Sequence, residues 1–235
     1  MAGHLNPGGQ QFRDDDGAAD PRVHAALAAY QAGQASEQDA LTALAAARLL
    51  VPVVAVLADG TAAEGDKNSE MVLPTLIGQD GRPAVLAFTG LGPLARWRPN
   101  ARPVPAEADR VWRAAVADGC AVVIDVAGPV PLAVEGMRLA ALAAGRAVPP
   151  VHEDGDVHAE VEAAVAAEPV IAGFSLAPSQ QVDLTVRLHL ADGDRAAASD
   201  WRPAVNQVAQ SIAGRLAGRL RRGVEFSVTR EPVGS

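Results

Sequence analysis

Residues 182–190 alternate strictly between apolar and polar side chains, which restricts this segment to one kind of structure. Successive side chains of a strand point to opposite faces of its sheet, so strict alternation predicts a strand with one buried face and one solvated face. Such strands are typical of antiparallel sheets. The buried face would carry the apolar members, Val182, Leu184, Val186, Leu188 and Leu190. The solvated face would carry Asp183, Thr185, Arg187 and His189.

A long amphipathic helix is predicted after this strand, over residues 203–219. Its core stripe consists of apolar residues at helical spacing, Val205, Val208, Ile212 and Leu216. The neighbouring patterns predict a helix at 157–167 and strands at 170–176 and 224–228. The resulting order, α-β-β-α-β, is typical of a small α+β sandwich.

The first part of the chain carries a similar mixture of patterns. The apolar run 49–57 predicts a buried strand, and Asp80-Gly81 predicts a turn between strands at 71–77 and 83–88. Ser36 and Asp39 form a capping-box pattern at the start of a helix. Residues 99–105 are expected to be a proline-rich connection. The remaining predicted elements are helices at 23–31, 93–97, 107–118 and 136–144, and strands at 121–126 and 130–134.

Together these patterns predict an α+β protein of two small mixed domains, each a mainly antiparallel sheet packed with helices. The 235 residues suit two such domains. Residues 1–20 are polar and are expected to be a disordered leader. The predicted boundaries are a first domain at 21–145, a linker at 146–156 and a second domain at 157–235.

Composition narrows the possible functions. Apolar residues make up 49% of the chain but aromatic residues only 3%, so the cores must consist mainly of Ala, Val and Leu. The net charge is −8, spread evenly along the chain, which disfavours nucleic-acid binding because such binding needs clustered cations. No apolar run is long enough to span a membrane, and a cytoplasmic location is expected. Cys120 lies in an apolar run and is predicted to be a buried structural thiol.

Several motifs occur in order between about residues 45 and 145. They are Lys67-Asn68-Ser69-Glu70-Met71 with Leu73-Pro74, Asp80-Gly81-Arg82, Ala87-Phe88-Thr89, Leu94 with Trp97, Ala101-Arg102-Pro103-Val104-Pro105, and Asp125-Val126-Ala127-Gly128-Pro129. Through these motifs the first domain resembles the SseB family, the enhanced-serine-sensitivity protein B group. The second domain resembles the C-terminal domain of that family through residues 182–190 and the helix after Trp201. The resemblance implies an α+β fold and a cytoplasmic bacterial protein, and it assigns no catalytic residue.

Residues Lys67, Asn68, Ser69 and Glu70 form the first candidate site. Lys67 is the only lysine among the twenty basic residues. Lys67 could bind a carboxylate, Glu70 an amine, and the side chains of Asn68 and Ser69 could form hydrogen bonds to the same ligand. Alternatively, these residues form a polar turn that leads into a strand, with the short side chains bonded to the local backbone.

Residues Arg96, Trp97, Arg98 and Arg102 form the second candidate site. Arginine forks suit phosphate and carboxylate groups, and tryptophan can stack on a planar ligand. The alternative is that Trp97 belongs to the core and the arginines form a solvated rim.

Two further patterns are weaker. His152, Asp154, Asp156 and His158 have side chains that could bind a metal, but they lie at the predicted linker and helix start, where Asp156 is expected to be the N-cap. The segment Gly90–Ala95 fits G-x-G-x-x-A, a pyrophosphate-binding pattern. Its preceding strand is predicted in a hairpin rather than in a parallel β-α-β unit, so a glycine-rich helix cap is the favoured interpretation.

These observations favour a non-catalytic binding protein over an enzyme, with no cofactor and no catalytic residue assigned. The expected partner is a protein or a small anionic ligand, bound by Lys67–Glu70 and Arg96–Arg102. One alternative is an enzyme that acts on an amino acid or a phosphorylated metabolite. Another is a self-associating module, paired through the helix 205–220 or the edge of strand 182–190.

Overall fold

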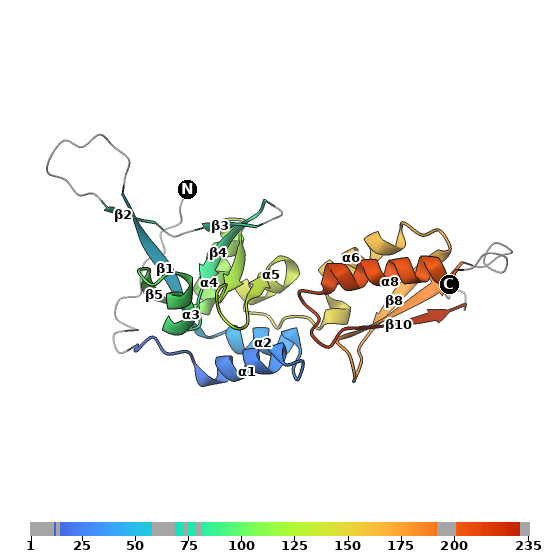
Figure 1. The fold of residues 1–235 in the computed structure, drawn as a ribbon, viewed down its shortest axis with the longest axis horizontal. Coiled ribbons are helices and arrows are strands. Elements are labelled where there is room, and N and C mark those ends of the chain that lie inside the picture. Colours follow the sequence, from blue (N-terminus) through green and yellow to red (C-terminus); the bar gives the residue numbers. More distant parts are fainter. Residues whose placement is uncertain are drawn as a thin grey trace. The chain divides into compact units, whose positions relative to one another are not determined.

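The computed structural model describes residues 12, 15–57, 69–72, 75–78, 81–191 and 201–230. The chain divides into two compact units. Unit 1 comprises Met1–Ala28 and Leu41–Ala147, and unit 2 comprises Ala29–Ala40 and Val148–Ser235. Helices accompany antiparallel and mixed sheets in both, which confirms the predicted α+β class (Figure 1).

The elements between residues 15 and 147 follow the predicted order closely. The helices are α1 (Pro21–Gln31), α2 (Glu37–Leu44), α3 (Leu91–Trp97), α4 (Ala108–Ala117) and α5 (Gly136–Ala143). The strands are β1 (Arg48–Leu57), β2 (Ser69–Val72), β3 (Thr75–Ile77), β4 (Pro83–Ala87), β5 (Arg102–Glu107), β6 (Ala121–Ile124) and β7 (Leu132–Val134). The predicted capping box begins α2, because the Ser36 backbone N–H donates to Asp39 at 2.9 Å and the Asp39 N–H donates to the Ser36 hydroxyl at 3.2 Å.

Two sheets meet in unit 1. One has the order β2-β1-β5 and the other β3-β4-β6-β7, and reciprocal backbone hydrogen bonds between Leu50 and Phe88 join them. Strand β4 pairs antiparallel with β3 but parallel with β6. Helices α4 and α5 pack against each other, and Trp112 of α4 is completely buried. Because β4 and β6 are parallel neighbours, their carboxyl ends lie side by side.

The predicted connection at 99–105 is partly a strand, β5, despite its prolines. The backbone N–H and C=O of Leu50 form hydrogen bonds with Phe88 and therefore point away from β5. The backbone groups that form hydrogen bonds with β5 are those of the adjacent residues, Leu49 and Val51. Pro103 and Pro105 pair opposite Pro52 and Leu50, so their positions are the non-hydrogen-bonded ones. The missing N–H groups point away from β1, which makes proline acceptable on this edge strand.

Residues 15–20, at the end of the predicted leader, have specific hydrogen-bond and ion-pair partners. The Arg48 guanidinium forms an ion pair with Asp15 at 2.7 Å and donates to the Ala18 carbonyl. The Leu91 N–H donates to the Gly17 carbonyl at 2.9 Å. A side chain at Gly90 would come within 2.8 Å of the Ala19 nitrogen, so glycine allows this close approach. The sequence pattern gives no sign of these long-range partners.

Unit 2 has the predicted α-β-β-α-β order. Its elements are the 3-10 helix η1 (Val151–Glu153), α6 (Gly155–Val165), β8 (Ile171–Ala177), β9 (Leu184–Leu190), α8 (Arg202–Leu216) and β10 (Val224–Thr229). Strand β9 lies in the middle of the sheet, antiparallel to β8 and parallel to β10. Helices α6 and α8 pack together and share a core with the sheet (Figure 1).

The burial of β9 and α8 confirms the two periodic patterns. Leu184, Val186, Leu188 and Leu190 are all buried, and so are the four apolar residues of the α8 stripe. The same arrangement bears on the edge of strand 182–190 and on the apolar stripe of the helix after it. Both edges of β9 are already paired, and the α8 stripe faces its own core. Within the described residues, no helix is long and apolar enough to cross a membrane.

Candidate functional site

Three exposed arginines gather where α3 leads into β5. Arg96 lies in the last turn of α3, Arg98 is its C-cap and Arg102 begins β5. The Ala101 N–H donates to the Arg98 carbonyl at 3.1 Å, so a tight turn keeps this segment compact. We call Arg96, Arg98 and Arg102 with Trp97 the arginine rim. Within the described residues, no carboxylate forms an ion pair with Arg96, Arg98 or Arg102.

Trp97 connects this rim to the core. Its side chain is half-buried and packs against a cluster that includes Leu50, Leu86 and Phe88. The ring centroids of Trp97 and Phe88 are 5.6 Å apart. The Arg98 guanidinium lies 5.0 Å from the centre of the Trp97 ring, within cation–π range. Trp97 could be a binding surface or a core residue according to the sequence, and each interpretation applies in part. Its ring is anchored in the core, yet it is partly accessible beside exposed cations.

A buried carboxylate lies next to the rim. Asp125 follows β6 and Thr89 follows β4, and the parallel pairing of these strands brings the two residues together. The Thr89 N–H donates to one Asp125 oxygen at 2.8 Å, and the Thr89 hydroxyl donates to the other at 2.6 Å. Arg96 donates to the Ala127 carbonyl in the adjacent turn at 3.3 Å. Two of the motifs that carry the family resemblance thus meet at one point.

The environment of Asp125 opposes its ionisation. Burial raises the pKa of the Asp125 carboxyl above its ordinary value. The two hydrogen bonds from Thr89 and the Coulomb interactions with Arg96 and His24 lower this pKa, but they offset the burial only in part. Asp125 also has a φ of 50°, in the left-handed region where aspartate and asparagine are favoured among residues with a side chain. Both carboxylate oxygens are bonded to Thr89, so the arrangement is suited to holding two strand ends together.

Arg48 is a central residue that the sequence patterns did not single out. Besides its contacts with Asp15 and Ala18, it donates to the Thr89 carbonyl at 3.2 Å. It therefore joins residues 15–18 to the end of β4. An arginine at the start of an apolar strand gives no local signal of such partners.

Described residues of the two predicted sites pair with opposite edges of strand β1. Lys67 and Asn68 lie outside the described residues, and Ser69 and Glu70 begin β2. Ser69 pairs with Leu57 on one edge of β1, while Arg102 pairs with Val53 on the other edge. These points are four residue steps apart along β1, which is about 13 Å in an extended strand.

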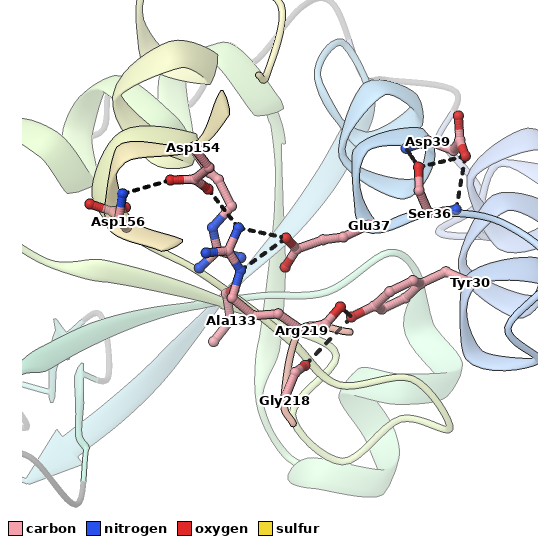
Figure 2. A network of polar contacts seen from close by, with 10 residues as sticks. Tyr30, Ser36, Glu37, Asp39, Ala133, Asp154, Asp156, Gly218 and Arg219 are labelled. Carbon is pink, nitrogen blue, oxygen red and sulfur yellow. Dashed lines mark hydrogen bonds and ion pairs between the residues drawn. The ribbon is translucent and has the colours of Figure 1, made fainter. Parts of the chain in front are cut away.

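The predicted metal-ligating residues have other partners (Figure 2). Asp154, not Asp156, is the N-cap of α6, and it accepts the Asp156 N–H at 2.9 Å. The other Asp154 oxygen accepts from Arg219 at 2.6 Å, and Arg219 also donates to Glu37 at 3.0 and 3.1 Å. In the described residues, no group of three or more His, Cys, Asp or Glu could hold a metal ion.

His158 and His152 are turned to separate contacts. The ring of His158 packs on Phe174, with 4.7 Å between ring centroids. His152 lies 3.6 Å from its neighbour Glu153. The sequence placed these side chains close together along the chain, but the helical start at Gly155 directs them to different surroundings.

The ion cluster of Glu37, Asp154 and Arg219 is largely buried. The exposed fractions of these side chains are 3%, 0% and 16%. Burial favours a neutral guanidinium, but the two carboxylates outweigh it and raise the pKa of Arg219. The Tyr30 hydroxyl donates to the Arg219 carbonyl at 2.9 Å, so residues 29–40 are tied to the end of α8 twice. Three residues so far apart in sequence give no pattern from which this cluster could be predicted.

Two other sequence predictions require correction. Cys120 is only half-buried, because it precedes β6 rather than lying within it, and its sulfur is 3.6 Å from the Asp118 carbonyl. Burial and the nearby Asp118 charge raise the pKa of its thiol. The strand before Gly90 does pair in parallel with β6, contrary to expectation. The helix that follows has only seven residues, and Gly90 acts as its N-cap, which agrees with the favoured interpretation.

The model of the SseB protein N-terminal domain matches residues 23–141, slightly more than half of the chain. The chain belongs to the SseB family. The region of the SseB match includes the arginine rim, Thr89 and Asp125. No curated protein and no solved structure shows a significant match to the chain.

Proposed function

We propose that this member of the SseB family is a non-catalytic binding protein that uses the arginine rim to recognise an anionic group. The group would belong to a protein partner or to a small ligand. The observation that supports this proposal is that three exposed arginines lie within residues 96–102, one of them over the Trp97 ring, in a protein whose net charge is −8.

Neighbouring arginines show why this gathering is unusual within the chain. Arg110 and Arg113 of α4 are also exposed, but each forms an ion pair with a nearby carboxylate, Glu107 and Asp109 respectively. The rim arginines instead offer guanidinium N–H groups to solvent. Guanidinium forks bind carboxylate and phosphate oxygens in pairs, and Trp97 supplies a fixed aromatic surface beside them.

We expect the double substitution R96A/R98A to weaken anion binding by tenfold or more, which corresponds to about 1.4 kcal/mol. Each lost guanidinium removes charge-assisted hydrogen bonds to the ligand. Binding of a hexaglutamate peptide and of citrate to the full chain, measured by isothermal titration calorimetry, checks this. Both residues are exposed, so the melting temperature should change little.

The matched control is R113A, which removes an exposed arginine that already has a carboxylate partner. It should bind both probes as the wild type does. Equal binding by R96A/R98A and the wild type, or no binding by the wild type, would contradict the proposal. That Lys67 also contributes to binding remains a separate proposal. Unchanged binding of both probes by the Lys67→Ala variant would contradict it.

A further inference from the structure

The sheet of unit 2 has a polar face on the side opposite its core. The core side carries the apolar residues of β9 together with Phe174, Leu176, Val224, Phe226 and Val228. Because side chains alternate along a strand, the intervening residues share the other face. Those residues are Gly173, Ser175 and Ala177 of β8, Thr185, Arg187 and His189 of β9, and Glu225, Ser227 and Thr229 of β10.

The strand register arranges these residues in rows. Arg187 is paired with Ser175 on one side and with Ser227 on the other. One row further along β9, His189 is paired with Thr229. One row back, on the other side of Arg187, Thr185 is paired with Glu225. The exposed cation at Arg187 is therefore flanked by two hydroxyl groups, with an imidazole on one side and a carboxylate on the other.

Two groups in the central row have unused hydrogen-bonding capacity. Arg187 is exposed and has no hydrogen-bond or ion-pair partner within the described residues. The Ser227 hydroxyl oxygen is buried and has no partner in the same part of the chain. A buried hydroxyl without a partner costs free energy, so a small movement of neighbouring side chains that lets it bond to a ligand would be favoured.

His189 orders two further hydroxyl groups. Its two ring nitrogens lie 2.9 Å from the Thr229 hydroxyl and 3.3 Å from the Ser175 hydroxyl. In neutral imidazole one ring nitrogen donates and the other accepts. The hydroxyl that accepts the ring N–H keeps its own hydrogen, which it can donate to a ligand beside Arg187.

We propose that this polar face binds a phosphate group at Arg187. The guanidinium fork would hold two phosphate oxygens, and the hydroxyls of Ser227 and of Ser175 or Thr229 would donate to the others. Neighbouring strands are about 5 Å apart and successive rows about 7 Å apart, so these donors surround one tetrahedral group. Glu225 repels the anion from the far row, which places the phosphate between Arg187 and His189.

The test is a titration of the full chain with inorganic phosphate, followed through the imidazole resonances of His189 by NMR. We expect a saturable shift in the wild type and an affinity at least about tenfold lower in R187A, because the bidentate bond is lost. S227A should weaken binding less, and E225Q should strengthen it because a like charge is removed. R215A is the matched control, since Arg215 is an exposed arginine of the same unit that is paired with Glu160.

No saturable shift in the wild type, or the same affinity in R187A, would overturn the proposal. R96A/R98A should leave this titration unchanged, so the failure of this site and the failure of the arginine rim can be distinguished. Parallel titrations with a phosphoserine peptide and with a mononucleotide distinguish the two sources of a phosphate monoester. Tighter binding of either one than of inorganic phosphate supports the site and identifies its ligand class.

Discussion

Replacing Arg219 by methionine is expected to lower the free energy of unfolding by about 3–5 kcal/mol. The substitution leaves Glu37 and Asp154 buried at 3% and 0% exposure without the cation that both contact. Two carboxylates that cannot be solvated then repel each other. Because whole domains are stable by only about 5–15 kcal/mol, the loss should be evident in urea denaturation at neutral pH.

Two further variants are the controls for this prediction. The triple substitution E37Q/D154N/R219M removes all three charges and should recover most of the stability, since neutral replacement of a whole buried ion cluster costs little. Asparagine at 154 can still cap α6. R215A, which breaks an exposed ion pair, should change the free energy of unfolding by less than about 1 kcal/mol. If R219M unfolds at the same urea concentration as R215A, the cluster does not stabilise the fold.

Replacing Asp125 by alanine is expected to cost about 2–4 kcal/mol, whereas asparagine should be nearly neutral. Alanine leaves the buried N–H and hydroxyl of Thr89 without an acceptor. Asparagine can accept the Thr89 N–H with its oxygen and donate to the hydroxyl with its nitrogen. Asparagine also tolerates the φ of 50° at this position. Thermal and urea unfolding of the two variants measure the difference.

The pH dependence of stability should separate these variants further. Burial raises the pKa of Asp125 in the folded protein above the unfolded value of about 3.9. Between these two pKa values the folded state holds a proton that the unfolded state releases, so the Asp125 contribution falls as pH rises through this window. D125N should lack that decrease and be at least as stable as the wild type at pH 7. A D125N variant as unstable as D125A would show that the carboxylate charge is required.

The elements with a strong local pattern could be predicted from the sequence. The alternation in β9 and the four-residue stripe of α8 correspond to the buried residues, and the capping box of α2 forms with its expected partners. Each of these depends on contacts within a few residues or on a period that a single face imposes. The SseB motifs could likewise be recognised in the sequence, and the match to the SseB N-terminal domain covers them.

The candidate sites were only partly predictable. Arg96, Arg98 and Arg102 were recognised because they lie close together in sequence, and the tight turn after α3 keeps them so. The partners of Asp154 were missed, because Glu37 and Arg219 lie far away along the chain. The pairing of Thr89 with Asp125 depends on the parallel register of β4 and β6, which no local pattern specifies.

The sequence by itself determined the α+β class, most helices and strands, and which side of each amphipathic element is buried. Hydrophobic periodicity is a local property, and burial of one face follows from it directly. Only the tertiary structure decided that Arg48 ties residues 15–18 to β4, that Arg219 joins two acids, and that Arg187 lies between two serines. These contacts depend on which strands are neighbours and in what register, and that choice is made by packing of the whole unit.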